Sequence, residues 1–323
     1  MYMQNDPQIE LAALREATGF ARITDRAYLR ITGSDAGRWL NGMVTNAVLK
    51  LNPGEGCYNF LLNAQGRNQG DCLIYREISA EPAEFLLATT AAQVSAIQQH
   101  LDRFIIMDDV ELTPSYSDES GLLILGKGAP AALVALGIPA LDPLRLVHAD
   151  TEHGPILLLT PHAGSVPRYE LRAATATIDG LRNTLTMLEV SPGALEHLRL
   201  LEATPIFGQD IRERDLPQEA AQDHALHFSK GCYLGQEIVE RIHSRGQVHR
   251  QFMAFRLTGD LPAVLPAPLE AAGKPAGELT SAALIPLPEG PTLVALGYAR
   301  REALDTRQPL TYPGGIAHPH PTK

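Results

Sequence analysis

Hydrophobic positions in the first 110 residues follow the two-residue period of strands in some segments and the helical period in others. Strands are predicted at Ala21–Ile31, Tyr58–Leu62, Cys72–Tyr75, Phe85–Ala88 and Phe104–Met107. Helices are predicted at Ile9–Ala17, after Thr32-Gly33-Ser34-Asp35 with Ser34 as N-cap, and from Thr90 to about Arg103. Asn63–Arg67 joins two of the strands as a hairpin connection. Paired strands that alternate with single helices predict α+β layers rather than a doubly wound parallel sheet.

The rest of the chain repeats this pattern and then changes. Further elements are predicted at Leu122–Leu125, Pro130–Leu136, Ile156–Leu159, Ser191–Glu202 and Ile238–His243, with an irregular stretch at Asp215–Phe228. After Gly246, alternating segments at Gln251–Leu257 and Thr292–Tyr298 are separated by proline-rich turns, which is typical of a small β-barrel. We therefore expect residues 1–245 to form two α+β subdomains. The division between them is expected near residue 110, and the two can be interleaved in the sequence. Residues 246–323 are expected to form the barrel.

Composition narrows the class of protein. The hydrophobic fraction of 45% is ordinary for a globular chain, and no run of about 18 apolar residues predicts a membrane span. The start MYMQNDPQIELAALREA carries acids and no basic region, unlike a secretory signal. Three widely spaced cysteines without a CxxC pair indicate a reducing cytoplasm and no metal site of the chain's own.

Charge bears on nucleic-acid binding. The net charge of −10 argues against sequence-independent binding of nucleic-acid phosphates, because such binding needs a basic face. We expect no direct nucleic-acid partner. A local basic groove is the alternative, since five basic residues lie close together in the sequence: Arg241, His243, Arg245, His249 and Arg250.

The segment Ser229–Glu237 reads S-K-G-C-Y-L-G-Q-E and carries the strongest chemical signal. A neighbouring lysine and a helix N-terminus both lower the pKa of a thiol, and Lys230 and the helix predicted after Gly235 place both beside Cys232. Glycines next to a reactive group permit close approach of the backbone to a ligand. The other interpretation is that Cys232 is a small buried hydrophobic residue before an ordinary helix start.

Lys230–Glu237 is similar to the signature K-G-C-Y-x-G-Q-E of the YgfZ family. These folate-binding proteins are related to the aminomethyltransferase (T-protein) of glycine cleavage and are implicated in maintaining iron–sulfur enzymes. Other stretches resemble the family over most of residues 25–250: Ile31–Asp35, Leu40–Gly42, Thr45-Asn46, Gly56–Tyr58, Leu61–Asn63, Gly66-Arg67, Asp71, Leu216–Ala220 and Gly246. The resemblance implies an α+β, aminomethyltransferase (GcvT)-like folate-binding fold of two subdomains plus a C-terminal β-barrel.

The resemblance also implies site residues, in three groups. The reactive group is Cys232, with Lys230 and with Glu237 to orient that lysine or accept a proton. The surrounding motif contributes Gly231, Tyr233, Gly235 and Gln236, of which Tyr233 covers the site and Gln236 fixes a ligand edge. Candidate folate contacts are Arg67, Asp71, Tyr28 and Glu202. Arg67 suits the carboxylates of a folate tail, whereas a turn arginine on the surface is the alternative. Asp71 is either a pterin ligand or a solvated charge at a strand end.

The sequence departs from the family at residues 199–205. Where the family carries R-x-E-A-G, this chain has Leu201 in the slot of the acid and Ala203 in the slot of the glycine. Glu202 lies one position away, and one residue turns a helix by about 100°, so its carboxylate is expected to point elsewhere. This departure bears on pterin binding and leaves the cysteine segment untouched.

The resemblance implies a cytoplasmic protein that binds tetrahydrofolate or another folate. It would support assembly or repair of iron–sulfur enzymes and thereby of tRNA-modifying enzymes. Its partners would be iron–sulfur client or assembly proteins, with no membrane. Two alternatives stay open: a tetrahydrofolate-dependent aminomethyltransferase of the glycine cleavage type, and a non-catalytic scaffold.

Overall fold

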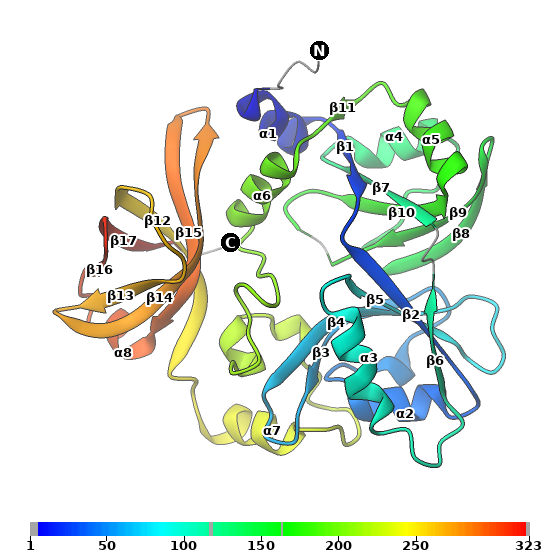
Figure 1. Ribbon diagram of the computed structural model, residues 1–323, viewed down its shortest axis with the longest axis horizontal. Helices are drawn as coiled ribbons and strands as arrows, with labels where there is room; N and C mark the ends of the chain where they lie inside the picture. Colours follow the sequence, from blue (N-terminus) through cyan, green and yellow to red (C-terminus); the bar gives the residue numbers. More distant parts are fainter. Residues whose placement is uncertain (1–5, 116–118, 163, 321–323) are drawn as a thin grey trace.

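The protein is described here by a computed structural model that covers residues 6–115, 119–162 and 164–320. Two sheets with covering helices lie on one side of the molecule, and a β-barrel lies on the other (Figure 1). The first sheet has the strand order β3-β4-β5-β2-β6. It is built from β2 (Arg26–Thr32), β3 (Gly56–Leu62), β4 (Asn68–Arg76), β5 (Phe85–Thr90) and β6 (Glu111–Ser115). Two helices, α2 (Ala36–Met43) and α3 (Val94–Asp102), bury Leu40, Ile97 and Leu101 in a common core with this sheet.

The second sheet has the strand order β11-β1-β7-β10-β9-β8. Its strands are β1 (Gly19–Ile23), β7 (Glu119–Leu125), β8 (Arg145–Thr151), β9 (Gly154–Thr160), β10 (Arg168–Ala174) and β11 (Leu188–Glu189). Helices α4 (Ala129–Ala135) and α5 (Thr175–Thr184) share a buried core with it through Leu133, Ile178 and Leu181. The N-terminal strand β1 thus belongs to the sheet that is otherwise built from residues 119–189.

The prediction of one strand over Ala21–Ile31 is wrong, because the structure divides this segment between the two sheets. β1 pairs with β7 and β11, whereas β2 pairs with β5 and β6. The chain leaves strand geometry at Thr24-Asp25, where the Asp25 carbonyl accepts a hydrogen bond from the Ala91 N–H. Both halves alternate apolar and polar positions, so periodicity along the chain does not reveal that they pair in different sheets.

The two sheets meet across a mixed apolar and ionic interface. Tyr28 and Tyr75 of the first sheet share a buried cluster with Leu157 and Leu159 of the second. Beside this cluster, Arg26 forms an ion pair with buried Glu170 at 3.0 Å. A buried carboxylate is tolerated when it is paired, so Glu170 requires Arg26 beside it. This ion pair and the apolar cluster together fix the relative placement of the two sheets.

The C-terminal barrel closes in the order β12-β15-β14-β13-β16-β17. Its strands are β12 (Arg250–Gly259), β13 (Ala267–Ala271), β14 (Lys274–Leu287), β15 (Gly290–Arg300), β16 (Leu310–Tyr312) and β17 (Gly315–His320), with α8 (Arg301–Asp305) between β15 and β16. Helices α1 (Pro7–Glu16) and α6 (Pro192–Leu201) lie between the barrel and the second sheet (Figure 1). A buried carboxylate, Asp210, also joins the two sides by accepting hydrogen bonds from Arg199, Thr280 and Ser281.

The α+β arrangement followed by a small β-barrel confirms the predicted fold class. Ser191 caps α6 as expected, by accepting a hydrogen bond from the Ala194 N–H. Three local predictions are wrong. The helix predicted from Thr90 begins at Val94 instead, and Thr90 is the last residue of β5. Ser34 does not cap α2, because its hydroxyl donates to Asp109, and the N-cap position is Asp35. Phe104–Met107 forms turns instead of a strand, with Ile106 and Met107 exposed to solvent. Across the residues covered by the structure, no helix combines the length and apolar character required to cross a bilayer.

Candidate functional site

The predicted cysteine segment forms an exposed loop that is fixed on both sides of Cys232. Cys232 is the one exposed thiol among the three free cysteines, whereas Cys57 and Cys72 are buried. On its C-terminal side, Tyr233 is 7% exposed, and the Leu234 N–H donates to the Gly42 carbonyl of α2 at 2.9 Å. The loop leads into α7 (Gln236–Arg245), which contains the helix predicted at Ile238–His243. An exposed thiol between fixed neighbours can react with a molecule in solution.

Gly235 and Gly66 bring this loop into contact with the β3–β4 hairpin. Gly235 has a φ of 81°, and a Cβ atom there would lie 2.5 Å from the Asn63 carbonyl oxygen. Gly66 has a φ of 67°, and its Cβ would lie 2.8 Å from the Cβ of Ile238 in α7. Both positions therefore require glycine for conformation and for space. The two glycine motifs, far apart in the sequence, form one contact.

The Lys230 ammonium is directed at backbone carbonyls. It donates hydrogen bonds to the oxygens of Asn41 at 2.7 Å, Val44 at 2.7 Å and Asn46 at 2.5 Å. Burial lowers the pKa of Lys230 to about 8, so the group is still mainly protonated at neutral pH, and the buried thiol of Cys57 opposes this shift. The expected acidification of Cys232 by Lys230 stays a prediction.

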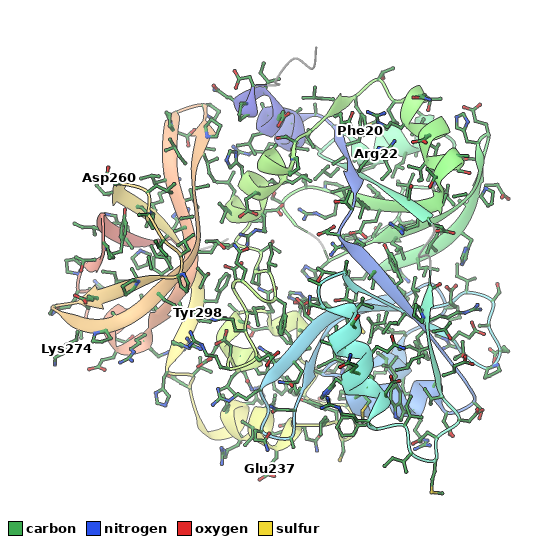
Figure 2. The ribbon with its side chains drawn as sticks, in the orientation of Figure 1. Phe20, Arg22, Glu237, Asp260, Lys274 and Tyr298 are labelled. Carbon is green, nitrogen blue, oxygen red and sulfur yellow. The ribbon has the colours of Figure 1, made fainter. Side chains whose placement is uncertain are left out.

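The remaining motif residues lie on α7 and at its start. The Gln236 side chain accepts a hydrogen bond from the Tyr233 N–H at 3.1 Å, so it supports the loop before the helix. Glu237 is exposed in the first turn of α7, at the edge of the molecule (Figure 2). The Tyr233 ring lies in a buried cluster with Phe60 and Val239.

Asp71 lies in a hydrogen-bonded network within the first sheet. Its carboxylate accepts from the Tyr58 hydroxyl at 2.6 Å and from the Gln93 amide at 2.8 Å. Burial raises the pKa of this carboxyl, and the hydrogen bonds from Tyr58 and Gln93 oppose the shift. A carboxyl group with a perturbed pKa and aligned donors is typical of a ligand-binding or catalytic position. The prediction of a solvated strand-end charge does not describe this environment.

Sequence reasoning missed a stack of rings beside Asp71. The Tyr58 ring lies 5.3 Å from that of His224, which in turn stacks on His162 at 3.7 Å. Partial burial, together with the neighbouring His162, lowers the pKa of His224 to about 4, so this ring is neutral at pH 7. Tyr58 and Asp71 face the same side of the hairpin, since Tyr58 pairs with Leu73 and Asp71 with Phe60. The hairpin register could have predicted that pair, but nothing local predicts the two histidines.

Thr45-Asn46 connects the Asp71 network to the cysteine loop. The Asn46 amide donates to the carbonyls of Tyr58 and His224, and its own carbonyl accepts from Lys230. The Thr45 hydroxyl donates to the Ala225 carbonyl and accepts from the Phe60 N–H. This dipeptide therefore ties β3, the 224–225 turn in η3 (Asp223–Ala225) and the loop into one unit.

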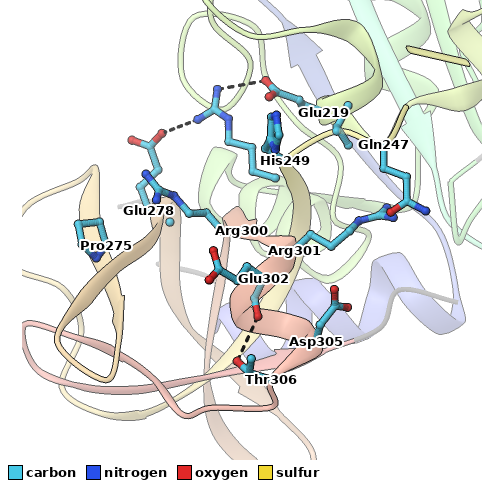
Figure 3. Close-up of a pocket in the computed structure, with 13 residues that line it drawn as sticks. Glu219, Gln247, His249, Pro275, Glu278, Arg300, Arg301, Glu302, Asp305 and Thr306 are labelled. Carbon is cyan, nitrogen blue, oxygen red and sulfur yellow. Dashed lines mark hydrogen bonds and ion pairs between the residues drawn. The ribbon is translucent and has the colours of Figure 1, made fainter. Parts of the chain in front are cut away.

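Two cavities differ in chemical character. One of about 400 Å³ has mainly apolar walls, to which four prolines contribute, and includes His162, which connects it to the ring stack. The other, of about 990 Å³, lies where the barrel meets residues 247–250 (Figure 3). There Arg250 pairs with both Glu219 and Glu278. Flat ring systems bind between apolar walls that carry a few placed polar groups, so the smaller cavity suits a pterin better than the larger one.

Two other predicted folate residues lie apart from this network. Arg67 is exposed at the hairpin turn, and its guanidinium donates to the Arg214 carbonyl at 2.7 Å. Tyr28 is 2% exposed in the interface between the sheets, with the Arg172 guanidinium 5.0 Å from its ring centroid. Arg67 is accessible to a ligand, whereas Tyr28 leaves almost no surface for one.

Glu202 fixes a loop of the second sheet. Its buried carboxylate forms an ion pair with Arg168 at 2.6 Å and accepts hydrogen bonds from the N–H and hydroxyl of Ser165. Gly164 and Arg168 also line the 400 Å³ cavity, so Glu202 supports this wall through its ion pair with Arg168. Leu201 packs against the apolar core that includes α6. The expectation that Glu202 points away from the slot of the family's acid stays a prediction.

Ala203, at the position of a glycine in the family pattern, has a left-handed backbone conformation. Its φ is 50°, and it follows the last turn of α6, with its N–H donating to the Leu200 carbonyl. A left-handed conformation costs an alanine about 1–2 kcal/mol, and glycine avoids this cost.

Ala203→Gly should therefore stabilise the protein, by about 1 kcal/mol after the greater freedom of glycine in the unfolded chain is included. Chemical denaturation would measure the change. Ala194→Gly, inside α6, is the matched control and should destabilise by about 1 kcal/mol. A loss of stability in Ala203→Gly would contradict the strain at this position.

Comparisons with known proteins agree with the fold. Residues 2–146 match the family described as GCVT N-terminal domain. The glycine cleavage system aminomethyltransferase T from Bartonella henselae superposes with a TM-score of 0.83 at 19% identity, covering 98% of this chain and 88% of that one. An aminomethyltransferase of Exiguobacterium sibiricum is 26% identical over 284 residues, or 86% of this chain and 77% of that protein. The chain is thus related to GCVT-type proteins and has the aminomethyltransferase fold.

Other relatives carry a different name. The mitochondrial iron-sulfur cluster assembly factor IBA57 homolog of Pyricularia oryzae is 30% identical over 73% of this chain, and that of Aspergillus oryzae is 30% identical over 84%. The chain spans 56% and 62% of the lengths of these two proteins. In the part of the chain that the structure describes, no three His, Cys, Asp or Glu side chains converge as metal ligands.

Proposed function

We propose that this protein binds a reduced folate and supports the assembly or repair of iron–sulfur enzymes, as a member of the YgfZ family. The observation that carries the proposal is the exposed Cys232 on a fixed loop, joined through Thr45-Asn46 to the Asp71 network. The aminomethyltransferase fold and the similarity to iron-sulfur cluster assembly factors support it. The clients would include tRNA-modifying enzymes, and the protein would act in the cytoplasm.

The residues around Asp71 fit a folate. A pterin presents N–H donors on a flat ring, and Asp71 supplies carboxylate oxygens beside the rings of Tyr58 and His224. The adjoining cavity of about 400 Å³ is mostly apolar. Apolar walls with a few placed polar groups bind and orient such ligands. Arg67, accessible at the hairpin turn, would hold the tail carboxylates.

Cys232 would supply the reactive group. Its thiolate could attack an electrophilic one-carbon unit with the folate nitrogen as leaving group, hold a transient bond to iron, or attack a disulfide of another protein and release one of its two sulfurs as a thiolate. All three require a thiol that solvent and a partner can reach, and Cys232 meets this condition. Glu237, exposed in the first turn of α7, would accept a proton near the loop.

Cys232→Ser should preserve folding and abolish the ability of the gene to restore iron–sulfur enzyme activity in cells that lack their own homologue. Serine has nearly the same size and shape but is a far weaker nucleophile and soft-metal ligand. Ser229→Ala, at an exposed position of the same loop, is the matched control and should restore activity fully. Full restoration by Cys232→Ser would remove the thiol from the function and favour a scaffold.

An aminomethyltransferase reaction is the second candidate, because relatives of that name are similar over most of the chain. The support for it is weaker, since the sequence resemblance places Leu201 at the position where those enzymes carry an acid. Transfer of an aminomethyl group from a lipoyl carrier to tetrahydrofolate would be measured directly, and turnover by the purified protein would establish this reaction.

A further inference from the structure

The carboxyl end of α2 needs partners from elsewhere in the chain. The last four carbonyls of an α-helix receive no hydrogen bond from an N–H group within the helix, and they carry the negative end of its dipole. Basic residues in the last turn usually compensate both, but the last turn of α2 has none. Its C-cap residue, Val44, is already extended, so the chain turns away from the helix at once.

The cysteine loop supplies these partners. The Lys230 ammonium bonds to the Asn41 carbonyl in the last turn and to the carbonyls of Val44 and Asn46 just beyond it. The Leu234 N–H bonds to the Gly42 carbonyl. An ammonium has three N–H donors, and the three carbonyls use all of them. Such charge-assisted hydrogen bonds are stronger than those between neutral groups.

We propose that Lys230 is a positioning residue, which caps α2 from outside the helix and thereby fastens the cysteine loop to the first subdomain with the Cys232 thiol directed outward. The Tyr233 ring covers the ammonium at 5.0 Å, so Lys230 lies between α2 and the buried side of the loop. Lys230 and Leu234 hold the loop on either side of Cys232, and this thiol is the exposed one.

The same contacts direct the Lys230 ammonium toward the interior of the protein. The thiol with which its ammonium interacts electrostatically is that of buried Cys57, in β3. With its donors occupied by carbonyls, Lys230 holds the loop. The inference depends on the proposed function only in taking Cys232 as the working group, and its test measures the loop itself.

Lys230→Met keeps the length of the side chain and removes its donors. Hydrogen exchange at the Leu234 amide should become at least about tenfold faster, since a hydrogen bond to a charged group contributes about 1.5–3 kcal/mol. Lys50→Met is the control: it removes an exposed ammonium that lies 3.5 Å from the His227 ring, and it should leave the exchange rate of the Leu234 amide unchanged.

Unchanged protection of the Leu234 amide in folded Lys230→Met would overturn the proposal. If that variant does not fold, nitrogen-15 NMR of the wild-type lysines replaces it. The ammonium that shows contacts to the Tyr233 ring should exchange its protons slowly and show coupling across hydrogen bonds to carbonyl carbons. Rapid exchange without such coupling would overturn the proposal equally. Loss of function in Cys232→Ser is independent of either result.

Discussion

Asp71→Asn should weaken tetrahydrofolate binding by about tenfold or more, because a hydrogen bond to a charged acceptor contributes about 1.5–3 kcal/mol. The carboxylate already holds the Tyr58 hydroxyl and the Gln93 amide, each at less than 3 Å, and offers further lone pairs to a ligand. An asparagine retains one oxygen and presents an N–H₂ group where an acceptor is needed. Isothermal titration calorimetry of both proteins would measure the difference.

The pH dependence gives a second readout of the same residue. Burial raises the pKa of Asp71, so its carboxylate is protonated at a higher pH than an ordinary aspartate. Affinity should therefore fall as the pH is lowered through this raised pKa, and this part of the fall should be missing in Asp71→Asn. Asp102→Asn, at an exposed position at the end of α3, is the matched control and should bind as the wild type does. Equal affinities of the wild type and Asp71→Asn would exclude Asp71 from the site.

Gly235→Ala should reduce the free energy of unfolding by about 2 to 4 kcal/mol, from a left-handed backbone and from overpacking. At a φ of 81°, an alanine Cβ would lie 2.5 Å from the Asn63 carbonyl oxygen and 3.0 Å from the Leu62 Cβ. Backbone atoms cannot move aside as a flexible side chain can, so the loop must shift away from the hairpin. Urea denaturation would measure the loss.

Gly231→Ala is the control for this prediction. It lies in the same loop, and a Cβ there meets no atom within 4 Å. Its effect should stay within about 0.5 kcal/mol, as for other surface substitutions. Similar stabilities for the two variants would mean that the Gly235–hairpin contact is not formed in solution.

Periodicity in the sequence predicted much of the fold because most elements are locally consistent. Buried and half-buried positions alternate along most of β4, and α6 begins with a serine cap followed by proline. What it missed depends on partners distant in the sequence. Whether Ala21–Ile31 forms one strand or two is decided by pairing with β7 and β5, and the chain itself carries no mark of that choice.

The site shows the same division. The motif Lys230–Glu237 pointed to Cys232, which is exposed, whereas nothing in the sequence predicted that Gly66 and Gly235 contact each other. The partners of Lys230 could not be predicted, because they are backbone carbonyls and every residue has one. The stacking of His162 on His224 likewise depends on the packing of the second sheet against the turn that contains His224.

The proposed function depends most directly on folate binding. Calorimetric titration of the wild-type protein with tetrahydrofolate at neutral pH tests it. We predict saturable binding of one molecule per chain. Absence of saturable binding up to about 1 mM ligand, where the binding free energy is only about 4 kcal/mol, would contradict the proposal.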